Sequence, residues 1–172
     1  HQSERFRKPI YGGDHTKSNS DYSGSFLYVI PANPDKLKET LKKQGKDTRE
    51  IRTIYDYQVP VYEFGKTNYK ASMWISSVGE RDGEFSVKLS AIAEDGTLLG
   101  SATGKTPGLI KTDNRTKIQW RKVEFDFNSW DNETFKGQYI RLKIELVSAN
   151  SYEYGFGIDD IKLEAGYVWV EK

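Results

Sequence analysis

The chain has 172 residues, of which 36% are hydrophobic, 13% aromatic and 30% charged, and its formal net charge is +1. This balanced charge gives no indication of nucleic-acid binding, and the absence of cysteine excludes disulfide frameworks and thiol chemistry. No stretch approaches the roughly 20 apolar residues of a membrane-spanning helix, so we expect no membrane insertion. The length suits a single domain over residues 1–172, and the aromatic-rich composition favours strands over a helical bundle.

The N-terminal segment, residues 1–22, is polar and irregular. Because the chain begins at His1 without a methionine, we expect a mature or excised piece of a larger protein. The first predicted strand is Gly24–Ile30, which is aromatic and β-branched and is ended by Pro31.

One short surface helix is predicted around residues 34–44. Asn33 suits the N-cap, Pro34 the first helical position and Gly45 the C-terminal cap. Two leucines four residues apart give a narrow apolar stripe, and lysines occupy most other positions. A solvated insertion and a lysine-rich partner-binding helix both remain open.

From residue 51 the chain alternates between apolar and polar residues in successive runs, as strands with one buried face do. The predicted strands are Ile51–Val61, Tyr69–Ser76, Phe85–Ala93, Trp120–Phe127 and Tyr139–Val147. An Asp-Gly hairpin turn is predicted at Glu94–Thr97. Residues 100–117, rich in Gly, Pro and Thr, are predicted to form a long loop.

The last predicted strand carries two adjacent carboxylates, Asp159 and Asp160. Strict alternation places Asp159 on the core face with Ile161 and Leu163. An inward carboxylate needs a partner. The residues alone do not decide whether this partner is a structural cation, a basic side chain in a salt bridge or a backbone N–H group that the carboxylate caps. Together the strands predict an all-β, antiparallel β-sandwich with its core over residues 20–164 and a short C-terminal tail.

Five phrases follow one another in an order that is typical of one fold family. They are Tyr22–Phe26, Tyr69–Trp74, Trp120–Phe127, Gln138–Leu142 and Gly157–Leu163. In this order the chain resembles the galactose-binding-like jelly roll of carbohydrate-binding modules in secreted glycan-degrading enzymes and of MAM-type receptor domains. MAM-type domains normally contain disulfides, so the missing cysteines count against that branch.

The resemblance implies a structural calcium ion at one edge of the sandwich. Its expected ligands are Asp159 and the carbonyl groups of Tyr22 or Ser23, with Asp14 and Asp21 as candidates for a second carboxylate. Calcium prefers six to eight oxygen ligands, and the segment that holds these residues is rich in them. Asp159 would then clamp the last strand to the N-terminal segment.

Sugar binding needs an aromatic ring for the C–H face of a sugar and planar polar side chains for its hydroxyl groups. Trp74 lies on the polar side of its strand, where a large aromatic residue is unusual; packing beneath a covering segment is the alternative. On the same nominal face of neighbouring strands we expect further polar residues, and other aromatic residues are candidates for one rim. The full set of candidate carbohydrate-binding residues is Trp74, Lys70, Lys88, Arg141, Lys143, Trp130, Tyr152 and Tyr154.

The segment 101–123 carries six basic residues against one acid, Asp113. A basic segment on a glycan-binding scaffold favours an acidic polysaccharide, because Arg and Lys pair with carboxylate and sulfate groups. A plain solvated loop is the alternative. Few aromatic residues interleave with these bases, so nucleic acid is not expected.

Catalytic motifs are scarce. Glu124 and Asp126 share a strand face but lack the third carboxylate expected of jelly-roll glycoside hydrolases, and both histidines, His1 and His15, fall in the irregular N-terminal segment. We therefore predict an extracellular or cell-surface, non-catalytic carbohydrate-binding module, linked to neighbouring domains of a secreted bacterial enzyme, that targets this parent enzyme to a polysaccharide. The alternative is an adhesion or structural β-sandwich domain of a cell-surface protein.

Overall fold

The computed structural model describes residues 10–11, 26–31, 33–45, 53–61, 66–78, 83–112, 115–128, 139–150 and 155–168. The strands are β1 (Ile10–Tyr11), β2 (Leu27–Val29), β3 (Thr53–Pro60), β4 (Lys66–Val78), β5 (Phe85–Ala93), β6 (Leu98–Lys105), β7 (Ile110–Thr112), β8 (Arg115–Lys117), β9 (Arg121–Asn128), β10 (Tyr139–Ala149) and β11 (Gly155–Val168). The helix within these ranges is α1 (Pro34–Lys43).

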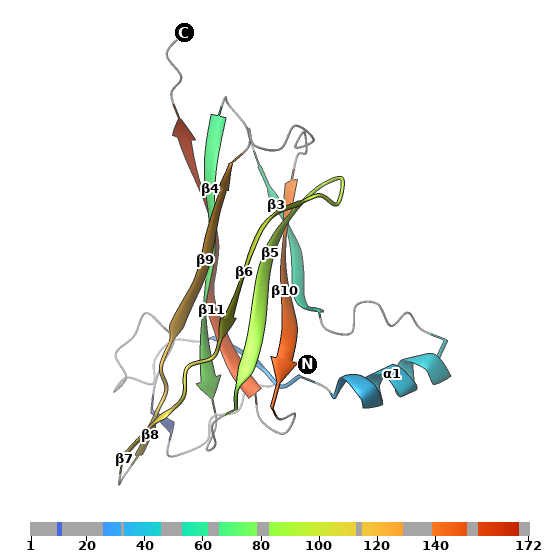
Figure 1. Ribbon diagram of the computed structural model, residues 1–172, viewed down its shortest axis with the longest axis vertical. Coiled ribbons are helices and arrows are strands. Elements are labelled where there is room, and N and C mark those ends of the chain that lie inside the picture. The colour runs from blue at the N-terminus through green and yellow to red at the C-terminus, as the bar shows by residue number, and fades with distance from the viewer. Residues whose placement is uncertain are drawn as a thin grey trace.

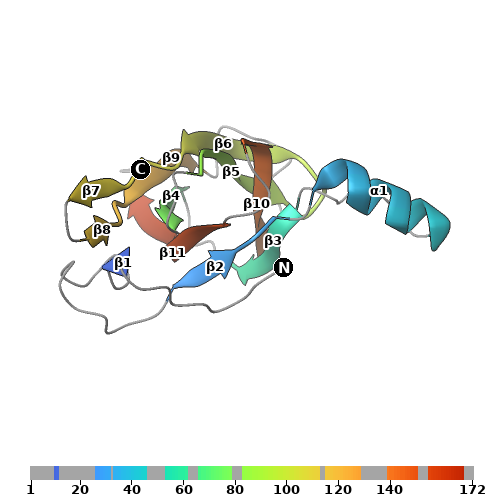
Figure 2. The same ribbon diagram turned by 90° about the horizontal axis from the view of Figure 1, so that it is seen from below.

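Two four-stranded antiparallel sheets face each other across the core (Figures 1 and 2). We name them the β4 sheet, with the order β2-β11-β4-β9, and the β5 sheet, with the order β3-β10-β5-β6. The chain crosses from one sheet to the other between β2 and β3, β3 and β4, β4 and β5, β6 and β9, β9 and β10, and β10 and β11, which is jelly-roll connectivity. The predicted antiparallel β-sandwich is confirmed. A three-stranded sheet, β1-β8-β7, lies at one end (Figure 1).

The core is formed by the apolar rows that alternation predicts. These rows, none more than 4% exposed, are Phe85, Val87, Leu89 and Ala91 on β5, Ile140, Leu142, Ile144 and Leu146 on β10, and Tyr69, Ala71, Met73 and Ile75 on β4. The rings of Phe85 and Phe156 join the two layers, with centroids 4.9 Å apart. Burying each large side chain contributes about 1.5–3 kcal/mol, so these rows hold the sheets together.

The predicted helix is confirmed with its caps. The Asn33 side chain accepts a hydrogen bond from the Asp35 N–H at 3.0 Å. Gly45 ends the helix with φ +68°, in the left-handed region that glycine adopts without strain. Figures 1 and 2 show α1 projecting from the side of the sandwich, so α1 itself lies over the outer face of neither sheet.

The loop predicted over residues 100–117 is wrong, because β6 occupies its first part and the β7–β8 hairpin occupies much of the rest. The small residues of β6 serve packing between the sheets. A Cβ on Gly100 would lie 2.7 Å from the ring of Phe125, and one on Gly104 would lie 2.6 Å from the Val123 side chain. Glycine at these positions therefore lets β6 approach β9 at the edge of the sandwich.

The predicted inward orientation of Asp159 is also wrong. Ile158, 1% exposed, faces the core, whereas Asp159 pairs with Trp74 on the outer face and is half-buried. A β-bulge follows, with Asp160 at φ +49° and its N–H donating to Asp159 Oδ1 at 2.9 Å. The extra residue resets the alternation, so Ile161 packs against the core. β11 continues past residue 164 as far as Val168, paired with β4.

Candidate functional site

The structure divides the predicted binding residues between two surfaces. Trp74 and Lys70 lie on β4, whereas Lys88, on β5, and Arg141 and Lys143, on β10, belong to the opposite sheet. The expectation that these five share one face is wrong, because β4 and β5, although consecutive, belong to different layers. Three more candidates, Trp130, Tyr152 and Tyr154, lie outside the described residues.

We call the outer face of the β4 sheet the Trp74 face. Residues directly opposite each other in an antiparallel pair point to the same side, so the strand register defines rows across this face. The rows are Asp159, Trp74 and Lys122; Lys162, Ser72 and Glu124; and Glu164, Lys70 and Asp126. One tryptophan thus stands among charged side chains near the centre of the sheet.

The indole of Trp74 is half-buried and has small neighbours along its strand. Ser72 and Ser76, the outward residues on either side, are short side chains that are 4% and 0% exposed, so larger neighbours cover both. The Lys122 ammonium lies 5.9 Å from the ring centroid, at the outer limit of a cation–π contact. The arrangement provides a flat apolar surface with a polar border.

The charged border of the Trp74 face is held by exposed ion pairs. Lys122 Nζ lies 3.1 Å from Glu124 Oε2, and Lys70 Nζ lies 3.9 Å from Asp126 Oδ1. Exposed pairs of this kind contribute about 0–1 kcal/mol, so a ligand can displace them at little cost. Their oxygens accept and their ammonium groups donate hydrogen bonds.

One end of the Trp74 face is closed by an aromatic pair. The rings of Phe26 and Trp120 meet edge to face, with centroids 5.3 Å apart. A Cβ on Gly157 would lie 3.0 Å from Phe26 and 3.1 Å from Trp120, so these rings cover the row that joins Gly157 to Ser76. The row of Trp74 lies next to this covered row and is therefore the first accessible row of the face.

We call the outer face of the β5 sheet the Arg141 face. The Arg141 guanidinium binds the Asp56 carboxylate through two bonds, of which Nε to Oδ1 measures 3.1 Å and the other joins Nη2 to Oδ2. Lys88 lies opposite Glu145 in the register. A two-pronged bond fixes both partners, so the guanidinium of Arg141 serves the sheet itself.

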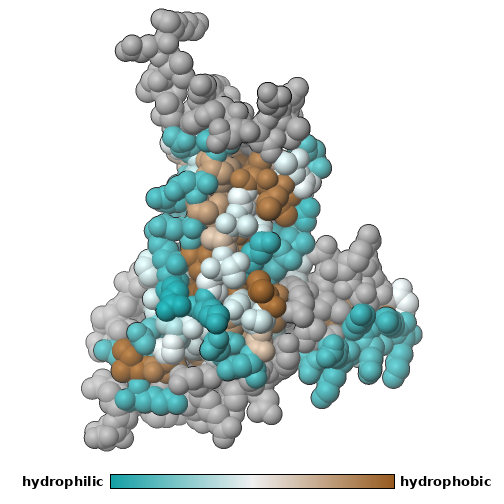
Figure 3. All heavy atoms as spheres, in the orientation of Figure 1, coloured by the Kyte–Doolittle hydropathy of each residue, from teal (hydrophilic) through white to brown (hydrophobic). Residues whose placement is uncertain are grey.

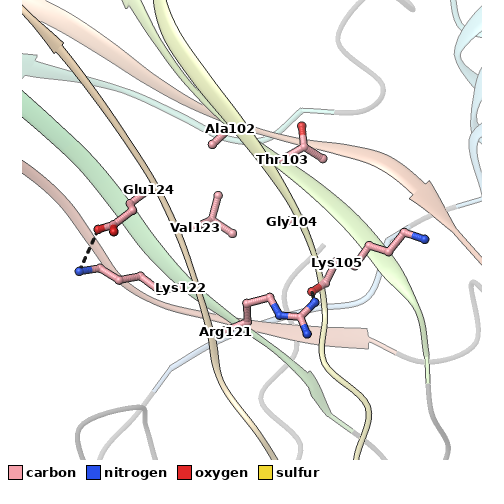
Figure 4. Close-up of a pocket in the computed structure, with 8 residues that line it drawn as sticks. All are labelled: Ala102, Thr103, Gly104, Lys105, Arg121, Lys122, Val123 and Glu124. Carbon is pink, nitrogen blue, oxygen red and sulfur yellow. Dashed lines mark hydrogen bonds and ion pairs between the residues drawn. The ribbon is translucent and has the colours of Figure 1, made fainter.

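A groove of about 420 Å³ lies where the two faces meet, between β6 and β9 (Figure 4). Its lining residues are Ala102, Thr103, Gly104 and Lys105 from β6, and Arg121, Lys122, Val123 and Glu124 from β9. In Figure 4, Lys122 and Glu124 point to one side of β9 and Arg121 points toward β6. Figure 3 shows a pale strip in this region, bordered by hydrophilic side chains, as the small residues of β6 require.

The sequence places Arg121 and Lys122 in the basic segment 101–123 and Glu124 in an acidic pair, but it assigns none of the three to the binding site. Alternation in β9 indicates that Lys122 and Glu124 point away from Val123, so their orientation could be predicted. Their position beside Trp74 could not be predicted, because it depends on the pairing of β9 with β4.

The predicted calcium site remains a prediction. Asp159 is the one predicted ligand that the structure describes, since Asp14, Asp21, Tyr22 and Ser23 lie outside the described residues. Within the described ranges, no group of three or more His, Cys, Asp or Glu residues is placed to hold a metal ion. No described helix is long and apolar enough to cross a membrane.

Comparison with known proteins identifies no family. No family model and no curated protein matches the chain. A solved structure described as "CBM4 structure and function" shares 14% identity at a TM-score of 0.49, covering 82% of this chain and 71% of that one. Another, "EclA C-terminal domain; sugar-binding protein", shares 14% at a TM-score of 0.48, covering 87% of this chain and 84% of that one. Both TM-scores are below 0.5, and the function of this chain is inferred from its own side chains.

Proposed function

We propose that this domain is a non-catalytic carbohydrate-binding module and that the Trp74 face is its glycan-binding surface. The observation that carries the proposal is the half-buried indole on a central strand, flanked by two short serines and bordered by paired charges. Stacking of a sugar ring on an indole needs a flat apolar surface of this kind.

The border residues suit sugar hydroxyl groups. Lys122 and Glu124 stand on the next strand from Trp74, and Asp159 stands opposite it on the other side. Together they offer donors and acceptors within reach of a ring stacked on the indole. Glu124 and Asp126 each contact a lysine, and these exposed ion pairs suit a binding surface.

We further propose that the module tethers a secreted bacterial parent protein to a polysaccharide, which raises the local concentration of the substrate. The basic character of residues 101–123 favours an acidic polysaccharide. The structural calcium ion implied by the family resemblance would tie Asp159 to the N-terminal segment.

Titration of the domain against neutral and acidic polysaccharides tests the binding surface. Trp74→Ala should lower affinity at least about tenfold, because truncating a central tryptophan typically costs about 2 kcal/mol or more. Lys143→Ala, on the Arg141 face, is the matched control and should bind like the wild type.

Equal binding by wild type and Trp74→Ala would exclude the Trp74 face. If the wild type binds no glycan of a broad panel, an adhesion or structural role becomes the better account of the fold.

A further inference from the structure

We infer that the groove between β6 and β9 binds an acidic substituent of the glycan, a carboxylate or a sulfate, with Arg121 as its principal ligand. The inference rests on the proposed function, because it extends the binding surface from Trp74 across β9. It assigns a location and a residue to the preference for acidic chains.

Arg121 occupies a position where the strand pattern calls for an apolar side chain. The inward row of β9 contains Phe127, Phe125 and Val123, and the next position in that row is Arg121. Val123 is 4% exposed, whereas Arg121 is exposed at the end of the row. An aliphatic residue there would extend the core, so the guanidinium is not explained by packing.

The guanidinium of Arg121 is positioned but not neutralised. Its Nη1 donates to the Lys105 carbonyl at 2.9 Å, which anchors the side chain to β6. In the part of the chain that the structure describes, no carboxylate forms an ion pair with it. A guanidinium has five N–H donors, so this anchor leaves further donors and the full charge for a ligand.

Two lysines flank the groove. In Figure 4 the Lys122 side chain points away from β6 and the Lys105 side chain points away from β9. Lys122 contacts Glu124 at 3.1 Å, and Lys105 contacts Glu84 at 3.2 Å. All four side chains are more than 40% exposed, so both pairs contribute little to stability and can rearrange around an anion. Arg121 is the lining cation that is left without a counter-ion in the described structure.

The groove is within reach of a glycan stacked on Trp74. Lys122 is the direct cross-strand neighbour of Trp74 and also lines the groove. Neighbouring strands lie about 4.8 Å apart, so a chain that crosses β9 from Trp74 reaches the groove next. Its volume of about 420 Å³ falls within the range of small-molecule sites, roughly 300–1,000 Å³.

The chemistry selects anions over neutral sugars. A guanidinium binds carboxylate and sulfate through two parallel hydrogen bonds, and charge-assisted bonds are roughly twice as strong as neutral ones. A neutral glycan would use the Trp74 face but gain little from Arg121.

Side-chain NMR of the intact domain tests the groove directly. The Arg121 Nε–H signal is followed during separate titrations with galacturonate, galactose 6-sulfate and galactose. We expect a shift with the anionic sugars and none with galactose. A response to galacturonate alone would assign a carboxylate site, and a response to both anions a general acidic-sugar site. No response to either anion would overturn the inference.

Binding to polygalacturonate and to a neutral galactan provides the second test. Arg121→Gln keeps a donor for the Lys105 carbonyl and removes the charge, so affinity for polygalacturonate should fall about tenfold. Affinity for the neutral chain should be unchanged. Lys88→Gln removes one charge from the Arg141 face and should leave both affinities within about twofold. Thermal melting of the variants verifies that each is folded.

The outcomes separate the two proposals. If Trp74→Ala loses glycan binding and Arg121→Gln binds polygalacturonate like the wild type, the Trp74 site stands and the anion site is wrong. If no polymer binds but galacturonate shifts the Arg121 signal, the anion site stands and the Trp74 site fails.

Discussion

The two outer faces of the sandwich share the same strand alternation but use their polar residues differently. On the Arg141 face, the central guanidinium is held by Asp56 through two bonds. On the Trp74 face, a half-buried indole stands between two buried serines, and the charges at its border form exposed pairs. The first arrangement stabilises the sheet, whereas the second leaves an apolar ring and displaceable polar groups at the surface. A polar sheet face is therefore a candidate binding site where an apolar ring is accessible and the surrounding ion pairs are weak enough for a ligand to displace.

The largest expected difference between the faces concerns the predicted calcium ion at Asp159. If the free calcium concentration is 100 times the Kd of the site, binding adds about 2.7 kcal/mol to the free energy of unfolding. For a chain of this size chelation should then lower Tm by roughly 5–10 °C, measured by calorimetry. Asp159→Asn should remove this dependence, while Asp56→Asn on the Arg141 face should retain it. An unchanged Tm after chelation, with no metal copurifying, would exclude the ion.

The close contact between β6 and β9, at the edge where the two sheets meet, depends on the absence of a side chain at Gly104. Gly104→Ala would place a Cβ 2.6 Å from the Val123 side chain, so β6 must move away from β9. We expect a loss of about 1–3 kcal/mol in the free energy of unfolding, measured by urea denaturation. Gly108→Ala is the control, since its Cβ would meet nothing within 4 Å. Equal stability of the two variants would contradict the close packing of β6 on β9.

Arg141→Ala separates a stabilising role from a binding role. Loss of the Asp56 pair should lower the free energy of unfolding by about 1 kcal/mol, the upper end for partly exposed pairs, and Tm by about 2–4 °C. Glycan affinity should be unchanged in isothermal titration. A drop in affinity without a drop in stability would move the binding surface to the Arg141 face.

Lys122→Gln should have the smallest effect. It removes the cation beside the Trp74 ring, a contact worth about 0.5–1 kcal/mol at an exposed site, but keeps a donor for sugar hydroxyl groups. Affinity for a neutral glycan should fall about two- to fivefold, and Tm should change by less than about 2 °C. The matched change Lys143→Gln should alter neither quantity; equal losses in both variants would remove the distinction between the faces.

Much of the fold could be predicted from the sequence because local rules decide it. Alternation identified the buried row of β5, and Asn33 and Gly45 marked the ends of α1. The glycines of β6 lead to a wrong prediction of a loop. Glycine is common in loops, but it also occurs in strands that pack closely against a neighbour, and composition does not distinguish the two.

The candidate site could be predicted only in part. Alternation places Trp74 on an outer face, but it does not indicate to which sheet a strand belongs. It therefore groups Arg141 with Trp74, although β10 and β4 belong to different sheets. Strict alternation places Asp159 on the core face with Ile161 and Leu163. This is wrong because the β-bulge at Asp160 adds one residue and shifts the alternation. Both errors arise from long-range pairing, on which a residue pattern within one strand carries no information.

The central claim is that the Trp74 face, and not the Arg141 face, contacts glycan. Amide and indole NMR spectra recorded during titration with a bound oligosaccharide test it most directly. We predict that the Trp74 Nε1–H and the amides of Lys122 and Glu124 shift, while the amides of Lys88, Arg141 and Lys143 remain in place. Shifts confined to Lys88, Arg141 and Lys143 would contradict the account.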